Sequence, residues 1–250
     1  IMQLFIVGVL CCILALFTIK RTPELHNSFG VLCNWQMYAD IFQLVLITAY
    51  CLMPTHWAPG PHTLTSIIIC QTVETLYFFT GQLHVLMAVH RFVYITVPRW
   101  AKTWRRVTSS LIFICTATSI GRILLMTALD SRMYWVYDRE TALWFITETP
   151  WTFFYEMYLE LGWSIGEMVT ILILDGITLS RIRSWRAEIS PSRIAHRHIE
   201  TRLVMQSFCQ CIPTASITVL YFVVFPNVES QLVQFMCCTF VLSFGNVLDA

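Results

Sequence analysis

The sequence predicts an all-α membrane protein, a bundle of seven transmembrane helices. Of the 250 residues, 56% are hydrophobic and only 12% are charged, and the mean hydropathy is +0.64. Soluble domains carry about 25% charged residues, so a soluble fold with an unusually large core is the weaker interpretation. The apolar residues also form blocks long enough to cross a bilayer, which takes about 20 residues, and the basic residues gather in alternate connections.

Seven predicted spans follow one another and are separated by helix-breaking residues. Pro54 and Pro61 lie between the second and third spans, Pro98 follows the third, and Pro226 closes the sixth. The expected helices form one domain over 1–250 and cover 1–19, 28–53, 63–97, 107–129, 151–180, 203–225 and 231–250. Because the chain starts and stops inside apolar runs, we expect a fragment that lacks the N-terminal tail and the end of helix seven.

The distribution of lysine and arginine predicts the orientation. Short cytoplasmic connections are enriched in both residues. The two sides of the predicted bundle hold thirteen and three of the sixteen basic residues. The larger group comprises Lys20, Arg21, Arg91, Arg99, Lys102, Arg105, Arg106, Arg181, Arg183, Arg186, Arg193, Arg197 and Arg202, and the smaller group Arg122, Arg132 and Arg139. The N-terminus is therefore expected outside and residues 130–150 in an extracellular connection.

The sequence shows none of the common signatures of catalysis, metal binding or nucleotide binding. The ten cysteines all fall in apolar segments, where free cysteine behaves as a small hydrophobe. His196 and His198 lack further ligands at metal-binding spacing and are better explained as part of a solvated basic loop. We therefore expect no enzyme activity, metal or cofactor. Membrane topology already accounts for the basic loops, so no nucleic-acid partner is expected either.

Polar residues inside the third predicted span indicate that it is surrounded by other helices. Gln71 and Glu74 lie in its outer half, and burying such groups in a membrane is costly unless they have a role. Glu74 could contact a ligand or simply be hydrogen-bonded to neighbouring side chains, and the sequence leaves both options open. Arg91 lies 17 residues further on, about 25 Å along the helix, at the cytoplasmic edge.

The fifth predicted span carries a regularly spaced acidic stripe. Its members are Glu156, Glu160, Trp163 and Glu167, at i, i+4, i+7 and i+11, which on a regular α-helix fall within a narrow arc. Three carboxylates on one stripe should line the bundle interior, in a cavity that favours a cationic or hydrogen-bond-donating small molecule. Alternatively, Glu156 lies among the lipid headgroups and only the other residues are buried.

Three further charged residues lie within or at the edge of the spans. A long side chain near the interface can extend to water, so Arg91 could be an anchor or a functional group. Asp40 lies near the middle of the second span, where it belongs either to a switching network or to a static polar pair. Asp175, near the inner end of the fifth span, is expected to pair with a neighbouring base.

Several segments carry a family resemblance. The triplet His90-Arg91-Phe92 resembles the acidic-Arg-aromatic end of helix three in rhodopsin-like receptors. "LHNSFGVLC" (25–33), "LHVLMAVHRFVYITVP" (83–98), "YLELGWSIGEMVTILILDGITLSRIR" (158–183) and "GNVLDA" (245–250) are similar, in order, to motifs of the nematode serpentine chemoreceptors of class x. The chain departs from the pattern at His90 and lacks the usual cysteines in the second outer connection.

The resemblance implies a G-protein-coupled chemoreceptor in the plasma membrane of a sensory neuron. A small environmental molecule would bind in the outer half, and a heterotrimeric G protein would bind the cytoplasmic end. By resemblance, the coupling residues would be His90, Arg91, Arg99, Arg105 and Arg181, and the activation network Asp40 and Asp249. The alternative is a multi-span transporter or channel that uses the acidic stripe; transporters often show inverted repeats and paired broken helices, and none was found here.

Overall fold

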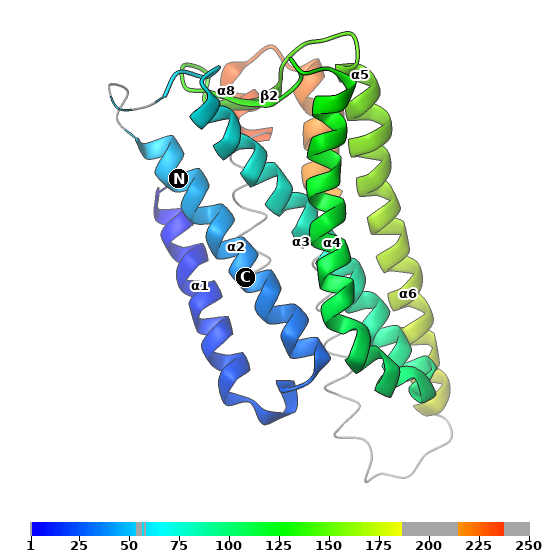
Figure 1. Cartoon of the computed structure of the whole chain (residues 1–250). Helices are drawn as coiled ribbons and strands as arrows, with labels where there is room; N and C mark the ends of the chain where they lie inside the picture. Colours follow the sequence, from blue (N-terminus) through cyan, green and yellow to red (C-terminus); the bar gives the residue numbers. More distant parts are fainter. Residues whose placement is uncertain (1, 54–56, 58, 187–214, 238–250) are drawn as a thin grey trace.

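The computed structural model describes residues 2–53, 57, 59–186 and 215–237 and confirms the predicted helical bundle. Its long helices stand side by side in Figure 1, with short turns between them. The long helices are α1 (Met2–Arg21), α2 (Ser28–Leu52), α3 (Leu64–Thr96), α4 (Ala101–Leu129) and α6 (Gly162–Arg186). The shorter helical elements are η1 (Pro23–Leu25), η2 (Pro98–Trp100), α5 (Thr152–Phe154), η3 (Tyr155–Leu161), the stretch Ala215–Asn227 with η5 (Leu220–Val224) and η6 (Phe225–Asn227), and α8 (Gln231–Phe235).

Helix α3 is the centre of the bundle. It packs against α2, α4 and α6, whereas α1 packs mainly against α2. A core cluster that includes Leu32, Phe79, Leu83 and Ile112 joins α2, α3 and α4. Because α3 has neighbours on several sides, polar residues in its middle such as Thr80, Gln82 and His90 are buried within protein.

The outer faces of the helices are apolar and exposed. On α1, Leu10, Leu14 and Phe17 point away from the bundle, and Phe113 and Leu124 do the same on α4. The stretch Pro98–Leu129 has the length and apolar composition of a membrane span, with a mean hydropathy of 1.8 over its best window. A water-soluble monomer rarely exposes so much contiguous apolar surface, whereas lipid tails cover it at little cost.

Local signals set the helix boundaries. The Asn27 side-chain oxygen accepts hydrogen bonds from the backbone of Phe29 (2.9 Å) and Gly30 (3.2 Å), which caps the start of α2. Thr63 caps α3 in the same way, by accepting from the Ser66 amide. Helix α4 begins at Ala101, six residues before the expected start at 107, because its first turns are basic and extend beyond the apolar segment.

The connection 130–150 contains a β-hairpin that the sequence analysis did not predict, so the fold is not purely α-helical. Strands β1 (Trp135–Asp138) and β2 (Leu143–Ile146) pair antiparallel, with Trp135 opposite Ile146. In the turn, Asp138 accepts hydrogen bonds from the Thr141 hydroxyl (2.6 Å) and the Glu140 amide. The Thr141 hydrogen bond lowers the pKa of Asp138 below its usual 3.8, so the ionised carboxylate stabilises the turn and this contribution is lost in strong acid.

Arg139 fastens the hairpin to the end of α2. Its guanidinium donates hydrogen bonds to the backbone carbonyls of Tyr50 (2.7 Å) and Met53 (2.9 Å) and lies over the Tyr50 ring. These carbonyls have no partner further along the helix, so the arginine acts as a cap. The Tyr137 and Trp144 rings pack against Tyr50 from the hairpin side. The hairpin therefore covers one end of the bundle, at the top of Figure 1.

Replacing Arg139 with alanine should loosen this cover. The change removes two charge-assisted hydrogen bonds, which should cost about 2 kcal/mol of stability. The thermal unfolding midpoint of the purified protein in detergent should fall by several degrees. Arg132→Ala is the matched control, because Arg132 is 77% exposed and pairs only with Asp130 inside the connection. Equal midpoints for the two variants would contradict the capping role of Arg139.

Candidate functional site: an acid-lined cavity beneath the hairpin

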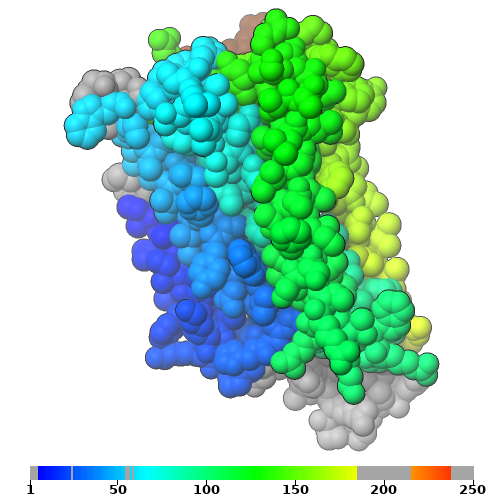
Figure 2. All heavy atoms as spheres, in the orientation of Figure 1, coloured from blue at the N-terminus to red at the C-terminus, as the bar shows by residue number. Residues whose placement is uncertain are grey.

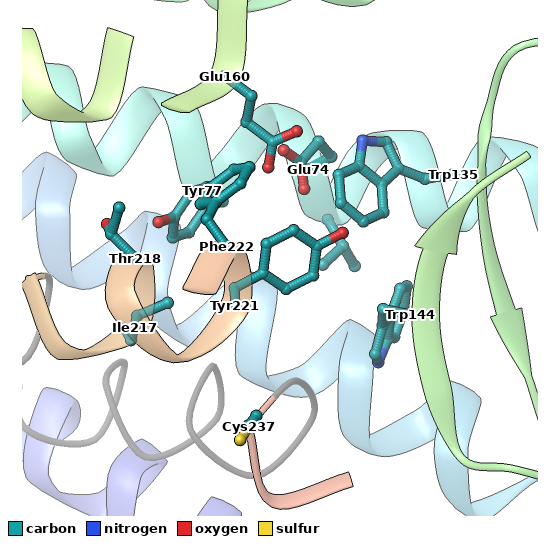
Figure 3. Close-up of a pocket in the computed structure, with 11 residues that line it drawn as sticks. Glu74, Tyr77, Trp135, Trp144, Glu160, Ile217, Thr218, Tyr221, Phe222 and Cys237 are labelled. Atoms are coloured by element: carbon teal, nitrogen blue, oxygen red, sulfur yellow. The ribbon is translucent and has the colours of Figure 1, made fainter. Parts of the chain in front are cut away.

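A cavity of about 50 Å³ lies directly under the hairpin. Figure 3 shows its walls: α3 contributes Glu74, η3 contributes Glu160, and the two strands contribute Trp135 and Trp144. The remaining lining residues are Val73, Tyr77, Ile217, Thr218, Tyr221, Phe222 and Cys237. The cavity thus joins the third span, the fifth span, the stretch 215–227 and the covering connection.

Two carboxyl groups from different helices meet in this cavity. In Figure 3 the Glu74 and Glu160 side chains point toward one another from neighbouring helices. Glu160 is only 5% exposed, and among the described residues neither Glu74 Oε1 nor Glu160 Oε2 has a hydrogen-bond partner. Unpaired acids in a buried site are costly, so the arrangement suits a group that donates hydrogen bonds to both.

Aromatic rings form much of the rest of the wall. Trp135 and Tyr221 lie with their ring centroids 6.2 Å apart, and Trp144 and Phe222 complete the lining. The faces of such rings attract cations. Acids and aromatic faces together make the cavity best suited to a small organic cation.

Arg122 is the basic residue nearest to the acids but is engaged elsewhere. Its Nη2 donates to the carbonyl of Leu159 (2.7 Å), and its guanidinium carbon lies 3.3 Å from the centre of the Phe78 ring. Within the described part of the chain, no salt bridge joins Arg122 to Glu74 or Glu160. The cluster of two acids and one base carries a formal charge of −1 when both acids are ionised.

The stripe expected on the fifth span is not continuous. Residues Tyr155–Leu161 form a π-helix, η3, which turns by less per residue than an α-helix and so changes which positions share a face. Glu160 faces the cavity, whereas Glu156 is half-buried outside it. Trp163 and Glu167 lie together on another surface, between α4 and α6. The regular α-helical spacing that suggested the stripe was therefore the wrong assumption.

The other polar positions predicted from the sequence lie away from this cavity. Gln71 is half-buried one turn before Glu74 and does not line the cavity. Asp40 is fully buried in α2, between the equally buried Gln36 and Gln43 on the same helix. Asp249 lies outside the described residues.

At the opposite end of the bundle, Arg91 and Asp175 form a buried ion pair between α3 and α6. Arg91 Nε and Nη2 lie 3.2 and 3.0 Å from Asp175 Oδ1, and Nη2 lies 3.1 Å from Oδ2. The two side chains are only 7% and 1% exposed. This geometry excludes a simple interfacial anchor for Arg91 in this state, because such an anchor would reach water. It also identifies the base that pairs with Asp175.

The other residues expected at the coupling surface divide into two groups. Arg99, Arg105 and Arg181 are exposed at the same end as Arg91. His90 instead turns inward: its ring stacks on Tyr94 with centroids 4.2 Å apart and packs against Phe29 and Trp104. His90 therefore contacts neighbouring helices and does not contribute to the exposed surface.

A helical bundle with a covered cavity at one end and a buried arginine at a basic opposite end defines the class of seven-transmembrane receptors. The family model for serpentine type 7TM GPCR chemoreceptor Srx matches residues 2–250, so the chain belongs to this family of G-protein-coupled chemoreceptors, which are integral proteins of the plasma membrane. No curated protein matches the chain closely enough to add a relative.

Breaking one side of the Arg91–Asp175 pair should be more harmful than removing both charges. Asp175→Leu leaves a buried guanidinium without its acid, which typically costs about 3–5 kcal/mol. The double variant Arg91→Met with Asp175→Leu should recover much of this loss. The coupling is tested by measuring thermal unfolding midpoints in detergent. The four proteins compared are the parent, Arg91→Met, Asp175→Leu and the double variant. Additive losses would show that the pair does not connect α3 to α6 energetically.

Proposed function

We propose that this receptor detects a small organic cation in the cavity beneath the hairpin and signals to a heterotrimeric G protein. The observation that carries the proposal is the meeting of Glu74 and Glu160 in a space walled by aromatic rings. An ammonium group satisfies both carboxylates and also gains from the ring faces. A neutral molecule with a single hydroxyl has one hydrogen to donate and would leave at least one acid without a partner.

The distribution of basic residues supports an extracellular position for this cavity. Lys20, Arg21, Arg99 and Arg105 lie at the end opposite the hairpin, and basic residues mark the cytoplasmic side. Ligand would then enter from outside, past the hairpin, in the plasma membrane of a sensory neuron. The exposed Arg99, Arg105 and Arg181 would form the docking edge for the G protein.

Signalling requires two packings of the bundle whose populations the ligand changes. The Arg91–Asp175 pair holds α3 and α6 together in the structure described here. In the proposed mechanism a cation bridges Glu74 on α3 and Glu160 on η3, and it changes how the two helices pack. Separation at the other end would free Arg91 for the G protein.

The orientation is tested by labelling single cysteines introduced at exposed sites. Arg132→Cys in the hairpin connection should react with an impermeant maleimide on intact cells, because this side is expected to be extracellular. Arg105→Cys at the start of α4 should react only after the cells are permeabilised. The parent protein is the control, because its labelling shows how much the native cysteines react. Labelling of Arg105→Cys on intact cells would overturn the orientation.

The ligand class is tested with paired amines and alcohols of equal chain length, with G-protein nucleotide exchange as the readout. The parent should respond to some of the amines. Glu74→Gln with Glu160→Gln should raise the half-maximal amine concentration at least tenfold, because each lost charge-assisted hydrogen bond costs about 1.5–3 kcal/mol. Glu156→Gln is the matched control, since Glu156 lies on the same π-helix as Glu160 but outside the cavity, and it should respond like the parent.

Three outcomes would contradict the proposal. If Glu156→Gln and the double variant weaken the response equally, the cavity does not select the ligand. If only neutral compounds activate the parent, the ligand class is wrong. If amines produce ion flux without nucleotide exchange, the protein is a transporter or channel and not a receptor.

Arg91→Ala is measured in three ways: its level at the cell surface, its amine binding and its nucleotide exchange. The comparison separates a loss of signalling from a loss of folding.

A further inference from the structure

A second hollow opens on the side of the bundle that faces lipid. Helices α4 and α6 both pack against α3, and an open groove of about 640 Å³ lies between them. Figure 2 shows α4 and α6 at the surface of the bundle on this side. The groove shares no lining residue with the cavity under the hairpin, so it is a separate site.

Small residues on α6 keep the groove open. Gly162, Gly166 and Thr170 follow one another at intervals of four, so they lie on one face of the helix and line the groove. A Cβ atom added at Gly166 would meet no other atom within 4 Å. No side chain of the described residues fills this space.

The floor of the groove is polar, which a lipid-facing surface does not require. Gln82 on α3 is only 7% exposed. Its Oε1 accepts a hydrogen bond from the Thr118 hydroxyl (2.7 Å), but its Nε2 has no partner among the residues that the structure describes. Glu167 accepts a hydrogen bond from the Trp163 indole through Oε1. Its Oε2 lies against Gly81, next to Gln82 in the chain, where an added Cβ would come within 2.6 Å.

The groove therefore presents an unused amide donor and a carboxyl oxygen at the bottom of an apolar trough. A single hydroxyl oxygen can accept a hydrogen bond from Gln82 and donate one to Glu167. An acyl chain has no group that can do either, so lipid tails alone would leave the buried amide unsatisfied. If this hydroxyl belongs to an alcohol, the apolar walls of the groove suit the hydrocarbon part of that molecule.

We propose that the groove between α4 and α6 binds a lipid-soluble alcohol that enters from the bilayer. Its hydroxyl would bind between Gln82 and Glu167, and its hydrocarbon would lie along the glycine face of α6. Because α3 and α6 also carry Glu74 and Asp175, occupancy of the groove is positioned to influence how these two helices pack.

Quenching of tryptophan fluorescence tests the site in the full-length protein reconstituted in phosphatidylcholine bilayers. The probe is a long-chain alcohol with two bromines on its hydrocarbon, and the comparison compound is its methyl ether, which cannot donate a hydrogen bond. Trp163 lines the groove, so the alcohol should quench its emission at lower concentration than the ether. Trp163→Phe should abolish this difference, which assigns the signal to the groove and not to other tryptophans.

Two variants separate the site from the general lipid boundary. Gln82→Leu keeps the side-chain size but removes the amide, and it should weaken alcohol-selective quenching about tenfold. Gln71→Leu is the matched control on the same helix, outside the groove, and should bind like the parent. Equal quenching by alcohol and ether, or parent-like quenching in Gln82→Leu, would overturn the proposal. A further test crosslinks two copies of the protein through α6. If the crosslink blocks quenching, the groove is a self-association surface and the proposal is overturned.

Discussion

The bundle depends on the buried pair between Arg91 and Asp175. A charge within a membrane protein is tolerated only when a partner compensates the lost hydration, and here the compensation joins the central helix α3 to α6. Glu74 lies 17 residues before Arg91 on the same helix, about 25 Å away. Since a helix moves nearly as a rigid rod, the pair at one end constrains how the two acids meet at the other.

The hairpin is held against the end of the bundle without a disulfide. The cysteines within the described residues are free thiols, and the connection 130–150 contains none. Arg139 instead satisfies carbonyls at the end of α2, and aromatic rings from the strands pack on Tyr50. Tyr50 is also hydrogen-bonded to Ser66 on α3, so the cover is tied to two helices at once. Such noncovalent fastening can open and close more easily than a covalent bond.

The π-helix at the start of the fifth span separates two acidic sites that the sequence places on one stripe. Glu160 turns into the bundle and meets Glu74, while Glu167 turns toward the groove and binds the Trp163 indole. The Leu159 carbonyl, within the same π-helical turn, accepts from Arg122 and holds that base beside Phe78. Such interruptions of an α-helix are frequent at functional sites. The two acids thus line two different hollows, the cavity under the hairpin and the groove between α4 and α6.

The sequence by itself determined the fold class, because the free energy of placing a helix in lipid depends mainly on which residues it contains. Proline positions and basic connections added the boundaries and the expected orientation. The sequence also marked Arg91, Glu74 and Glu160 as unusual, since charge in an apolar segment is costly wherever it lies.

Only the tertiary structure decided which of these charges meet. The contact between Arg91 and Asp175 spans 84 residues, and nothing local to either residue specifies the other. The hairpin and the π-helix were likewise missed. The hairpin had a local signal in the aromatic and β-branched residues of its strands, whereas the π-helix contacts a distant helix through the hydrogen bond from Arg122 to Leu159. Glu160 reaches Glu74, and Glu167 does not, because the packing of α6 on α3 decides which side of the helix faces the cavity. Sequence spacing alone does not fix this rotation of the helix about its axis.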